Sequence, residues 1–184
     1  MEGRRSVEDA VAAFLSALGQ DSKTNAELNG TPERVAEAWL EDLIVGYSMS
    51  AEQILSERCA AETKAAVVVR DLRAVVVCPH HLLPAWGVAH VAYLPGDDCV
   101  GFGALSQLVD CFGRRLALQE EVASNIADAL VDELGAQAAI CTLDLAHACM
   151  VVRGDRQAQA RAIVTAEAGE VPDSLRAAFI AGTR

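Results

Sequence analysis

Two β-rich segments, separated by a short connection that carries adjacent histidines, most constrain how this chain can fold. Residues 65–78 read AAVVVRDLRAVVVC, and residues 86–96 read WGVAHVAYLPG. Both segments are rich in β-branched residues, which favour strands. In the first segment, Arg70, Asp71 and Arg73 indicate a break or a solvated face. We predict an antiparallel pair of strands joined by the loop that contains CPHHLLP.

Helical patterns come before these strands. Residues 6–19 place apolar side chains on one helix face, and Gly19 favours an end to that helix. The segment TPERVAEAWLEDLIVGY predicts a second helix, with Thr31 as its N-cap and Pro32 in its first position. A further short helix is expected across residues 50–62.

The segments after the strands complete the order of elements. Two helices are expected at residues 104–117 and 119–134, and two β-like segments at residues 138–154 and 159–169. A short helix that starts near Pro172 closes the chain. The order helices, strand, strand, helix, helix, strand, strand predicts a single α+β domain. Within this domain we expect a helical N-terminal region over residues 1–63 and a region of strands and helices over residues 64–184.

The composition restricts the class of protein and its partners. The 184 residues are 52% apolar and 4% aromatic, which suits one compact domain and not a disordered chain. The net charge of −11 argues against a general nucleic-acid-binding surface, because phosphate contact needs clustered Lys and Arg. No apolar run approaches transmembrane length, and the N-terminus has the pattern of an amphipathic helix rather than a signal peptide. With six scattered cysteines, we expect a reducing, cytoplasmic setting and no nucleic-acid or membrane partner.

The chemistry-bearing residues gather in two short motifs. Zinc prefers cysteine thiolate and histidine imidazole, and a catalytic zinc has three protein ligands and one open position. Cys78 and His81 are separated by two residues, so a tight turn could aim both side chains at one ion. The third ligand could come from LAHACM, where His147 and Cys149 would share one side of a strand.

Other interpretations stay open at this point. Cys78 and its neighbouring histidines could instead be a nucleophile with its base, or a packed cysteine beside a surface imidazole. The remaining cysteines are interpreted as small hydrophobes without a function. They are Cys59, Cys99, Cys111 and Cys141.

Four motifs, taken together, resemble one known family. CPHHLLPAWGVAHVAYLP is similar to the zinc-site segment of GTP cyclohydrolase I, whose motif is Cys-Glu-His-His followed by a strand with His and Tyr-x-Pro. GTPERVAEAW, RRLALQEEVASNIADAL and HACMVVRG resemble three further motifs of that family, in the right order. Since the similarity covers residues 6–180, the chain is identified as a member of the GTP cyclohydrolase I family.

The resemblance implies a role for each residue that matches a family motif. Cys78, His81 and Cys149 would ligate one catalytic zinc, whereas His80 and His147 would be acid and base residues rather than ligands. The implied substrate-binding positions are Gln119, Glu120, Arg153, Phe102 and Gly103. Among these, the carboxylate would pair with the guanine N–H donors and the arginine would bind the triphosphate.

The resemblance also implies the architecture and the reaction. The expected fold is the α+β tunnelling fold, an antiparallel sheet with two helices packed on one face, preceded by the N-terminal helical region. Family members are toroidal homo-oligomers, commonly decamers, with active sites shared between subunits. In the implied reaction, zinc-activated water opens the guanine imidazole ring of GTP at C8, formate leaves, and the product is dihydroneopterin triphosphate.

The sequence departs from the family at four positions. The glutamate after the first zinc cysteine is Pro79, which stiffens the turn and removes a carboxylate. The family segment Gly-Leu-Ser-Lys aligns with GFGA, so its serine is Gly103 and its lysine is Ala104. The arginine three residues later is Gln107. The lysine and arginine belong to the triphosphate site, so this site loses two cations.

These departures leave three functions open. The chain could be the ordinary enzyme, with the phosphate site rebuilt from Arg153, Arg156 or Arg161. It could be a repurposed homologue that acts on a less phosphorylated purine and stops at a ring-opened pyrimidine. It could also be a non-catalytic paralogue that keeps zinc for structure, although we find only three convincing ligands and a structural zinc needs four.

Overall fold

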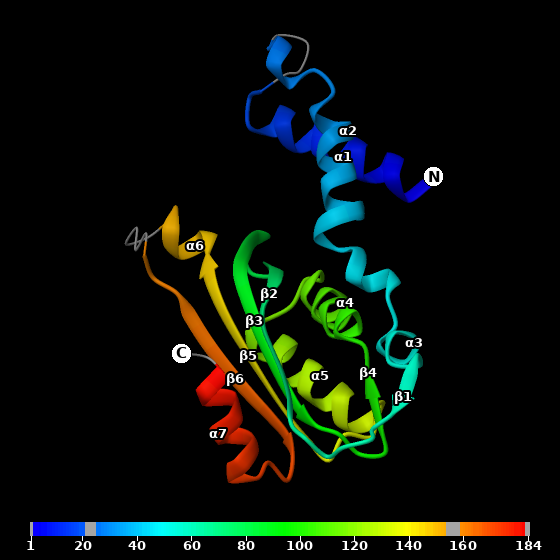
Figure 1. Cartoon of the computed structure of the whole chain (residues 1–184). Coiled ribbons are helices and arrows are strands. Elements are labelled where there is room, and N and C mark those ends of the chain that lie inside the picture. Colours follow the sequence, from blue (N-terminus) through cyan, green and yellow to red (C-terminus); the bar gives the residue numbers. More distant parts are fainter. Residues whose placement is uncertain (1, 21–24, 154–158, 183–184) are drawn as a thin grey trace. The chain divides into compact units, whose positions relative to one another are not determined.

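The computed structural model describes residues 2–20, 25–153 and 159–182 (Figure 1). Contacts divide the chain into two compact units, Met1–Val45 and Gly46–Arg184, which are described separately below. The division falls earlier than the boundary expected at residue 63, and the prediction of a single domain stays a prediction. Among the described residues, no helix combines the length and the apolar character needed to cross a membrane.

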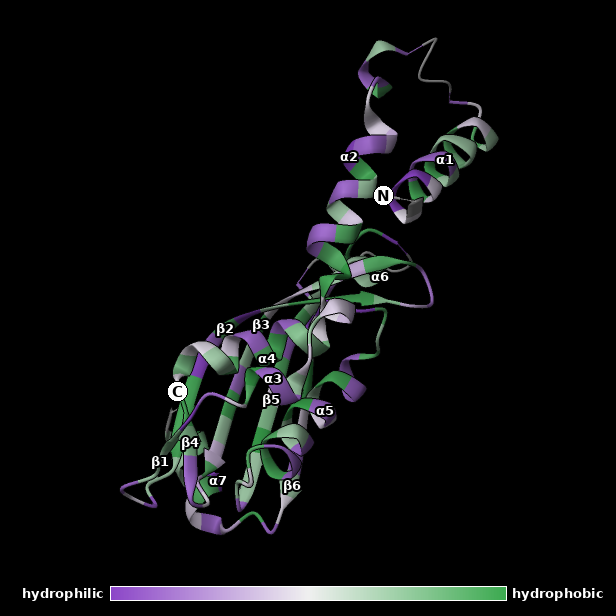
Figure 2. Ribbon diagram, turned by 90° about the vertical axis from the view of Figure 1, so that its right-hand side faces the viewer, coloured by the Kyte–Doolittle hydropathy of each residue, from purple (hydrophilic) through white to green (hydrophobic). Residues whose placement is uncertain are grey.

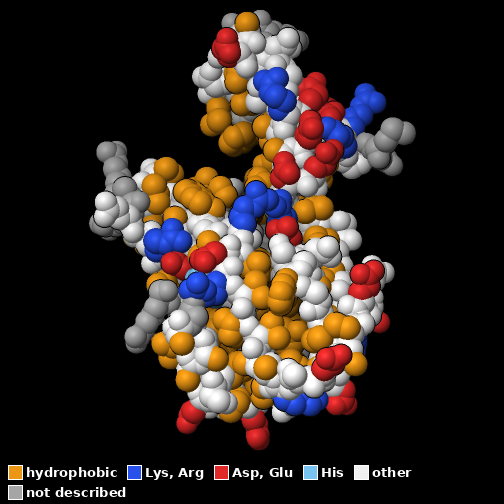
Figure 3. All heavy atoms as spheres, in the orientation of Figure 1, with side chains coloured by type: hydrophobic (Ala, Val, Ile, Leu, Met, Phe, Trp, Pro, Cys, Tyr) orange, Lys and Arg blue, Asp and Glu red, His pale blue; other side chains and the backbone are white. Residues whose placement is uncertain are grey.

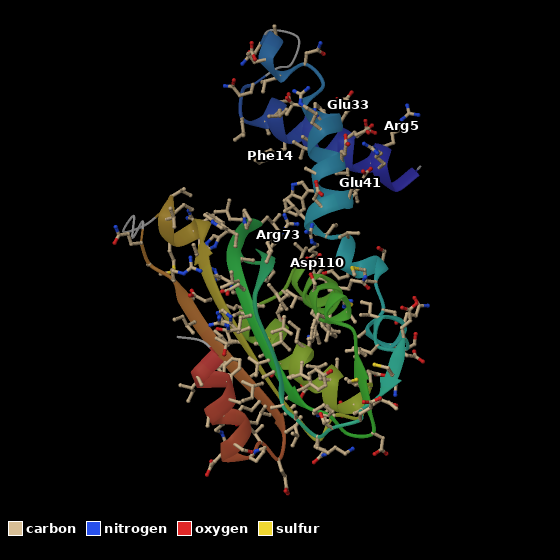
Figure 4. The ribbon with its side chains drawn as sticks, viewed as in Figure 1. Arg5, Phe14, Glu33, Glu41, Arg73 and Asp110 are labelled. Carbon is tan, nitrogen blue, oxygen red and sulfur yellow. The ribbon has the colours of Figure 1, made fainter. Side chains whose placement is uncertain are left out.

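The N-terminal unit is helical, as predicted. It contains α1 (Glu2–Ala17), η1 (Ala26–Leu28), α2 (Thr31–Glu37) and the π-helical η2 (Ala38–Leu43), and α1 packs against α2. Arg4 on α1 forms ion pairs with Glu37 and Glu41, at 3.5 and 2.8 Å. Figure 4 labels Glu41 together with Phe14, which is exposed on α1.

The predicted N-cap of α2 is wrong by one residue. Gly30 is the N-cap, with a φ of 71° that favours glycine, and Thr31 is already helical. The Thr31 hydroxyl accepts a hydrogen bond from the Arg34 guanidinium at 3.0 Å, so it is engaged with a side chain within the helix. Pro32 lies in the first turn, where its missing N–H costs nothing.

The second unit is an α+β structure built on a four-stranded antiparallel sheet. Its elements are η3 (Val45–Ser48, which begins one residue before the unit), α3 (Ala51–Ile54), β1 (Arg58–Ala60), β2 (Val67–Cys78), β3 (Leu83–Leu94), β4 (Asp98–Val100), α4 (Phe102–Gly113), α5 (Gln119–Asp132), β5 (Ala138–His147), α6 (Ala148–Val151), β6 (Ala162–Gly169) and α7 (Asp173–Gly182). The sheet order is β2-β3-β5-β6, and β1 pairs with β4 in a separate ladder. The predicted α+β class and the order of the long elements are confirmed, whereas β1 and β4 were not predicted.

Helices cover both faces of the sheet. On one face, α4 packs on β2 and α5 packs on β5 and β6, which confirms the expected pair of helices on one side (Figure 1). The core between these layers consists largely of Ala, Val and Leu side chains, and the strands show the corresponding hydrophobic colouring (Figure 2). On the other face, Leu175 and Phe179 of α7 pack against Ala92, Ala138 and Ile140.

A β-bulge interrupts β2 where the sequence indicated a break. Val69 pairs with Val91, but Leu72 pairs with Ala89, so β2 contains one residue more than β3 over this stretch. Asp71 at the bulge has a φ of 57°, and its backbone N–H donates to His90 Nδ1 at 3.2 Å. Because the side chains of a strand alternate between faces, the extra residue exchanges the faces of all later β2 positions.

At Gly87 the neighbouring strand β5 leaves no room for a side chain. A Cβ atom at this position would collide with the carbonyl oxygen of Asp144 on β5 and would lie 2.8 Å from the Arg161 guanidinium. The carbonyl belongs to the paired backbone and cannot move aside without disturbing the ladder.

We therefore predict that Gly87→Ala lowers the free energy of unfolding by about 1–3 kcal/mol, as overpacking does elsewhere. The matched control is Gly103→Ala, because a Cβ there meets nothing within 4 Å and alanine favours a helix. Urea denaturation of both variants checks this prediction. Equal stability of the two variants would contradict it.

Candidate functional site

The pairing of the strands places the predicted residues at one end of the sheet. Val76 pairs with Ala85, and Ala85 pairs with His147, so one row crosses β2, β3 and β5. Beyond the bulge, Val76 and Cys78 lie on the same sheet face as His147, the face that α5 covers. The bulge in β2 is therefore what brings Cys78 to the side of His147.

A cavity of about 240 Å³ lies at this place, between the strand ends and the start of α5. We call it the histidine cavity. Its lining comprises Val76, Cys78, His80, Ala85, Ala117, Leu118, Gln119, Glu120, His147, Met150 and Ala162. Five of the ten predicted site residues therefore meet here, surrounded by small and apolar side chains.

The hairpin loop between β2 and β3 carries the first motif. Cys78 and Leu83 form the last pair of the two strands, so the loop is only four residues long. The Leu82 N–H donates to the Cys78 carbonyl at 2.9 Å and closes the turn. Cys78 Sγ lies 3.8 Å from His80 Nδ1, and both residues line the histidine cavity. His81 is exposed, and its ring lies edge-on to that of His80.

The second motif does not continue as a strand. We expected His147 and Cys149 to share one side of a strand, but β5 ends at His147 and Cys149 lies in the short helix α6. Cys149 is partly buried, and α6 contacts the ends of β3 and β5. The strand argument for this pair is therefore wrong, although Cys149 remains at the same end of the sheet as Cys78.

The donor set suits zinc in its chemistry. Two thiols and an imidazole are soft and borderline ligands of the kind that zinc selects, and all three belong to segments at one end of the sheet. In residues 2–20, 25–153 and 159–182, however, no three His, Cys, Asp or Glu side chains already form a group that could hold a metal ion. The residues Cys78, His81 and Cys149 therefore stay a predicted ligand set.

Gln119 fixes the orientation of His147. This first residue of α5 is 4% exposed, and its amide Nε2 donates to the Leu143 and Ala162 carbonyls at 2.9 and 3.0 Å. Both amide hydrogens are then in use, so Gln119 Oε1 must accept from His147 Nε2, 2.7 Å away. The neutral imidazole therefore carries its proton on Nε2 and keeps the Nδ1 lone pair available.

Burial favours the neutral form of this imidazole. It lowers the pKa of His147 below its usual value, and the nearby Glu120 carboxylate opposes the shift by raising this pKa. Because the folded-state pKa lies below the unfolded one, protonation opposes folding. This reduces the free energy of unfolding as the pH falls below the unfolded pKa of about 6.5.

The other predicted substrate-binding residues lie in different parts of the structure. Glu120 is exposed and lines the histidine cavity. Arg153 is exposed just after α6, and Phe102 is 69% exposed at the start of α4. Arg153, Phe102 and Gly103 are not among the residues that line the histidine cavity.

A second cavity of about 480 Å³ lies between α3 and the start of α4. We call it the α3–α4 cavity, and its lining comprises Gln53, Ile54, Glu57, Gly101, Gly103, Ala104 and Gln107. Its lining contains one carboxylate and no Lys, Arg or His. The two cavities are therefore built from different elements of the fold.

We predict that Glu120→Gln lowers the pKa of His147 further, because the substitution removes the negative charge that raises it. The matched control is Glu121→Gln, next along α5, whose carboxylate instead accepts from the Leu118 N–H. Titration of the histidine ring protons by NMR measures both variants. A shift of equal size in the two variants would contradict the assignment.

Comparison with known proteins identifies the family of this chain. The sequence profile of the family "GTP cyclohydrolase I" matches residues 7–183. Proteins named GTP cyclohydrolase 1 are similar over most of their length. The protein from Bifidobacterium longum strain DJO10A is 39% identical over 164 residues, which are 89% of this chain and 81% of that protein.

Two further relatives with this name extend the similarity. The protein from Leifsonia xyli subsp. xyli is 38% identical over 181 residues, which are 97% of this chain and 94% of that protein. The protein from Thermobifida fusca is 36% identical over 172 residues, with 92% and 82% of the two chains covered. The chain is therefore a hydrolase with the tunnelling fold and belongs to the GTP cyclohydrolase I family.

Proposed function

We propose that this protein is a zinc-dependent cyclohydrolase that opens the imidazole ring of a guanine nucleotide, GTP or a related compound, at C8. Formate is released, and the product is dihydroneopterin triphosphate or a related compound. The observation that carries the proposal is the histidine cavity, where Cys78, His80, Gln119, Glu120 and His147 meet. Family membership makes the cyclohydrolase reaction the first candidate for this set of side chains.

Glu120 is suited to recognise the base. A carboxylate accepts two hydrogen bonds side by side, which matches the adjacent N–H donors on the pyrimidine edge of guanine. Its exposed side chain lines the histidine cavity from the first turn of α5. The small apolar side chains of Ala85, Ala117 and Ala162 leave room for a flat purine ring beside it.

The two histidines divide the proton transfers. His147 is held through Nε2 by Gln119, so its Nδ1 is the atom that takes up a proton from water or returns it to the opening ring. Its lowered pKa keeps this imidazole neutral near pH 7, which suits a base in the first step. His80, on the hairpin loop, is the second candidate for protonating the ring nitrogen as the bond opens.

Zinc, when bound by Cys78, His81 and Cys149, would acidify a water molecule at the same end of the sheet. Of these three residues, His81 is exposed, and Cys78 and Cys149 are partly buried. Pro79 restricts the backbone between the first ligand and the histidines, which favours one arrangement of this loop.

A homo-oligomer with shared active sites fits the distribution of residues. Phe102 and Gly103 lie away from the histidine cavity of their own chain, so in an assembly they would serve the site of a neighbouring subunit. Figure 3 shows hydrophobic side chains over much of one face of the second unit, with charged side chains mainly at its margins. Trp86, Phe102 and Ile163 are exposed apolar side chains of this unit. We propose that this homo-oligomer is a toroidal decamer.

A second candidate is a cyclohydrolase for a less phosphorylated guanine compound. The observation that favours it is the α3–α4 cavity, whose lining contains Ala104 and Gln107 but no cation. The Arg161 guanidinium is already engaged, because it donates to the Asp144 carboxylate at 2.6 Å and to the Asp144 carbonyl at 2.7 Å. It would have to leave these partners to supply a positive charge to the phosphates. Arg153 is exposed, and Arg156 lies outside the described residues.

Zinc content and turnover separate the roles of the motif residues. We expect the protein to hold one zinc ion per chain and Cys149→Ser to lose it, as measured by elemental analysis of the dialysed protein. His80→Ala should keep its zinc and lose about 10²–10⁴-fold in turnover, the usual size of a general acid–base contribution. The control is Asp128→Asn, at an exposed residue of α5 that lines neither cavity, which should keep both. Loss of zinc from His80→Ala with unchanged turnover would contradict the roles.

Substrate preference separates the two candidate functions. If the α3–α4 cavity no longer binds the substrate phosphates, the kcat/KM values for GTP, GMP and guanosine should differ by less than about tenfold. The reason is that charge-assisted hydrogen bonds to the phosphates would be missing. Gln107→Arg should then raise kcat/KM for GTP and leave that for guanosine unchanged. Formate release and pterin fluorescence are the measurements. A strong preference for GTP in the unaltered protein, with full pterin formation, would favour the ordinary enzyme.

A further inference from the structure

Two cysteines outside the histidine cavity face each other across the β1–β4 ladder. Cys59 and Cys99 are direct partners in this antiparallel pair, and their Sγ atoms are 3.2 Å apart. Each thiol also lies within reach of the opposite backbone carbonyl, at 3.5 and 3.4 Å. Cys59 is exposed and Cys99 is partly buried, so the interpretation as a small hydrophobe is wrong for Cys59.

The backbone geometry of this pair allows a covalent bond. Directly opposed residues of an antiparallel ladder have Cα atoms about 4.5–5.5 Å apart, within the range of about 4.4–6.8 Å found for disulfides. The S–S bond of about 2.05 Å requires the two sulfurs to approach by little more than about 1 Å. Rotation of the two side chains is sufficient for that movement.

Both strands are held by the surrounding structure. Arg58 on β1 donates to the carbonyls of Leu55 and Glu133. The Val100 N–H on β4 donates to the hydroxyl of the buried Tyr93 at 3.4 Å. The cysteines are therefore presented to each other by anchored strands rather than by a free loop.

The ladder is continuous with the α3–α4 cavity. Glu57, two residues before Cys59, lines that cavity from one side, and Gly101, two residues after Cys99, lines it from the other. A bond between the cysteines would therefore tie together two walls of the cavity.

We propose that Cys59 and Cys99 are a redox-modification site, where a reversible cross-strand disulfide fixes the walls of the α3–α4 cavity. The oxidant is a small-molecule disulfide of the glutathione class. The exposed Cys59 thiolate attacks it, forming a mixed disulfide and releasing one small thiol. The Cys99 thiolate then attacks the Cys59 sulfur and releases the second small thiol. The two protein thiols lose two protons and two electrons, and the small disulfide is reduced.

The order of attack follows from the surroundings of Cys99. Its pKa is raised above the usual value, first by the hydrogen bond with Cys59, and further by burial and by the charges of Cys59 and Asp98. Because Cys59 is exposed and Cys99 is partly buried, a small disulfide reaches Cys59 first, and Cys99 is the resolving thiol. The buried Cys111 and Cys141 do not compete, since burial raises the pKa of Cys141 to about 12.

The first test follows the bond itself and is independent of turnover. The full-length, zinc-loaded protein is incubated with oxidised glutathione, remaining thiols are alkylated, and the intact mass and peptides are analysed. We expect loss of two hydrogen atoms per chain, a peptide that links Cys59 to Cys99, and full reversal by dithiothreitol. Cys59→Ser and Cys99→Ser should each abolish the linked peptide, whereas Cys149→Ser should keep it.

Three results would overturn the proposal. They are a glutathione adduct at Cys59 that never converts to the linked peptide, a disulfide between chains, or a bond that maps to Cys78 and Cys149 instead. The second test measures amide hydrogen exchange with and without oxidant. Exchange over residues 53–60 and 98–107 should slow on oxidation in the unaltered protein and not in Cys59→Ser. Unchanged exchange would refute the link to the α3–α4 cavity.

Discussion

The extra residue in β2 is the constraint on which the histidine cavity depends. Up to Val69, the odd-numbered residues of this strand face the helices, and after the bulge at Asp71 the even-numbered ones do. Without the bulge, Cys78 would lie on the sheet face covered by α7, away from His147. The Asp71 N–H donates to His90 Nδ1, so a histidine of the opposite face helps to hold the bulge. A local irregularity thus decides which side chains can act together.

Gln119 performs a similar task from the helix side. It joins α5 to β5 and β6 through the Leu143 and Ala162 carbonyls, and it orients the imidazole of His147. An amide is suited to both tasks because it carries donors and an acceptor on one rigid group. The packing of α5 on the sheet and the tautomer of His147 therefore depend on the same side chain. The resemblance to the family suggested a substrate contact for Gln119, and that suggestion stays a prediction.

The sequence predicted long elements well and short ones poorly, for physical reasons. Strands of twelve residues and helices of twelve to fourteen residues contain several periods of their hydrophobic pattern, so β2, β3, α4 and α5 were found. The three-residue β1 contains no such period and is exposed, so the sequence pattern predicts a helix over these residues instead. The change from strand to helix after His147 was missed because Ala148 and Cys149 carry no stop signal.

Of the candidate site, the sequence predicted which motifs belong together but not how each side chain is used. Patterns in a chain do not contain hydrogen-bond directions, so the tautomer of His147 became evident only from its contacts with Gln119. The pairing of Cys59 with Cys99 was likewise invisible, because these residues are forty positions apart in two short strands. The zinc ligands and the subunit arrangement rest on the resemblance and stay predictions.

The separation of the two cavities has an evolutionary consequence. The histidine cavity is built from strand ends and the start of α5, whereas the α3–α4 cavity is built from α3, the end of β4 and the start of α4. A substitution at Ala104 or Gln107, which line the α3–α4 cavity, would therefore leave the lining of the histidine cavity unchanged. On the proposed function, a lineage with this architecture could change which compounds it accepts while it keeps the side chains of the histidine cavity.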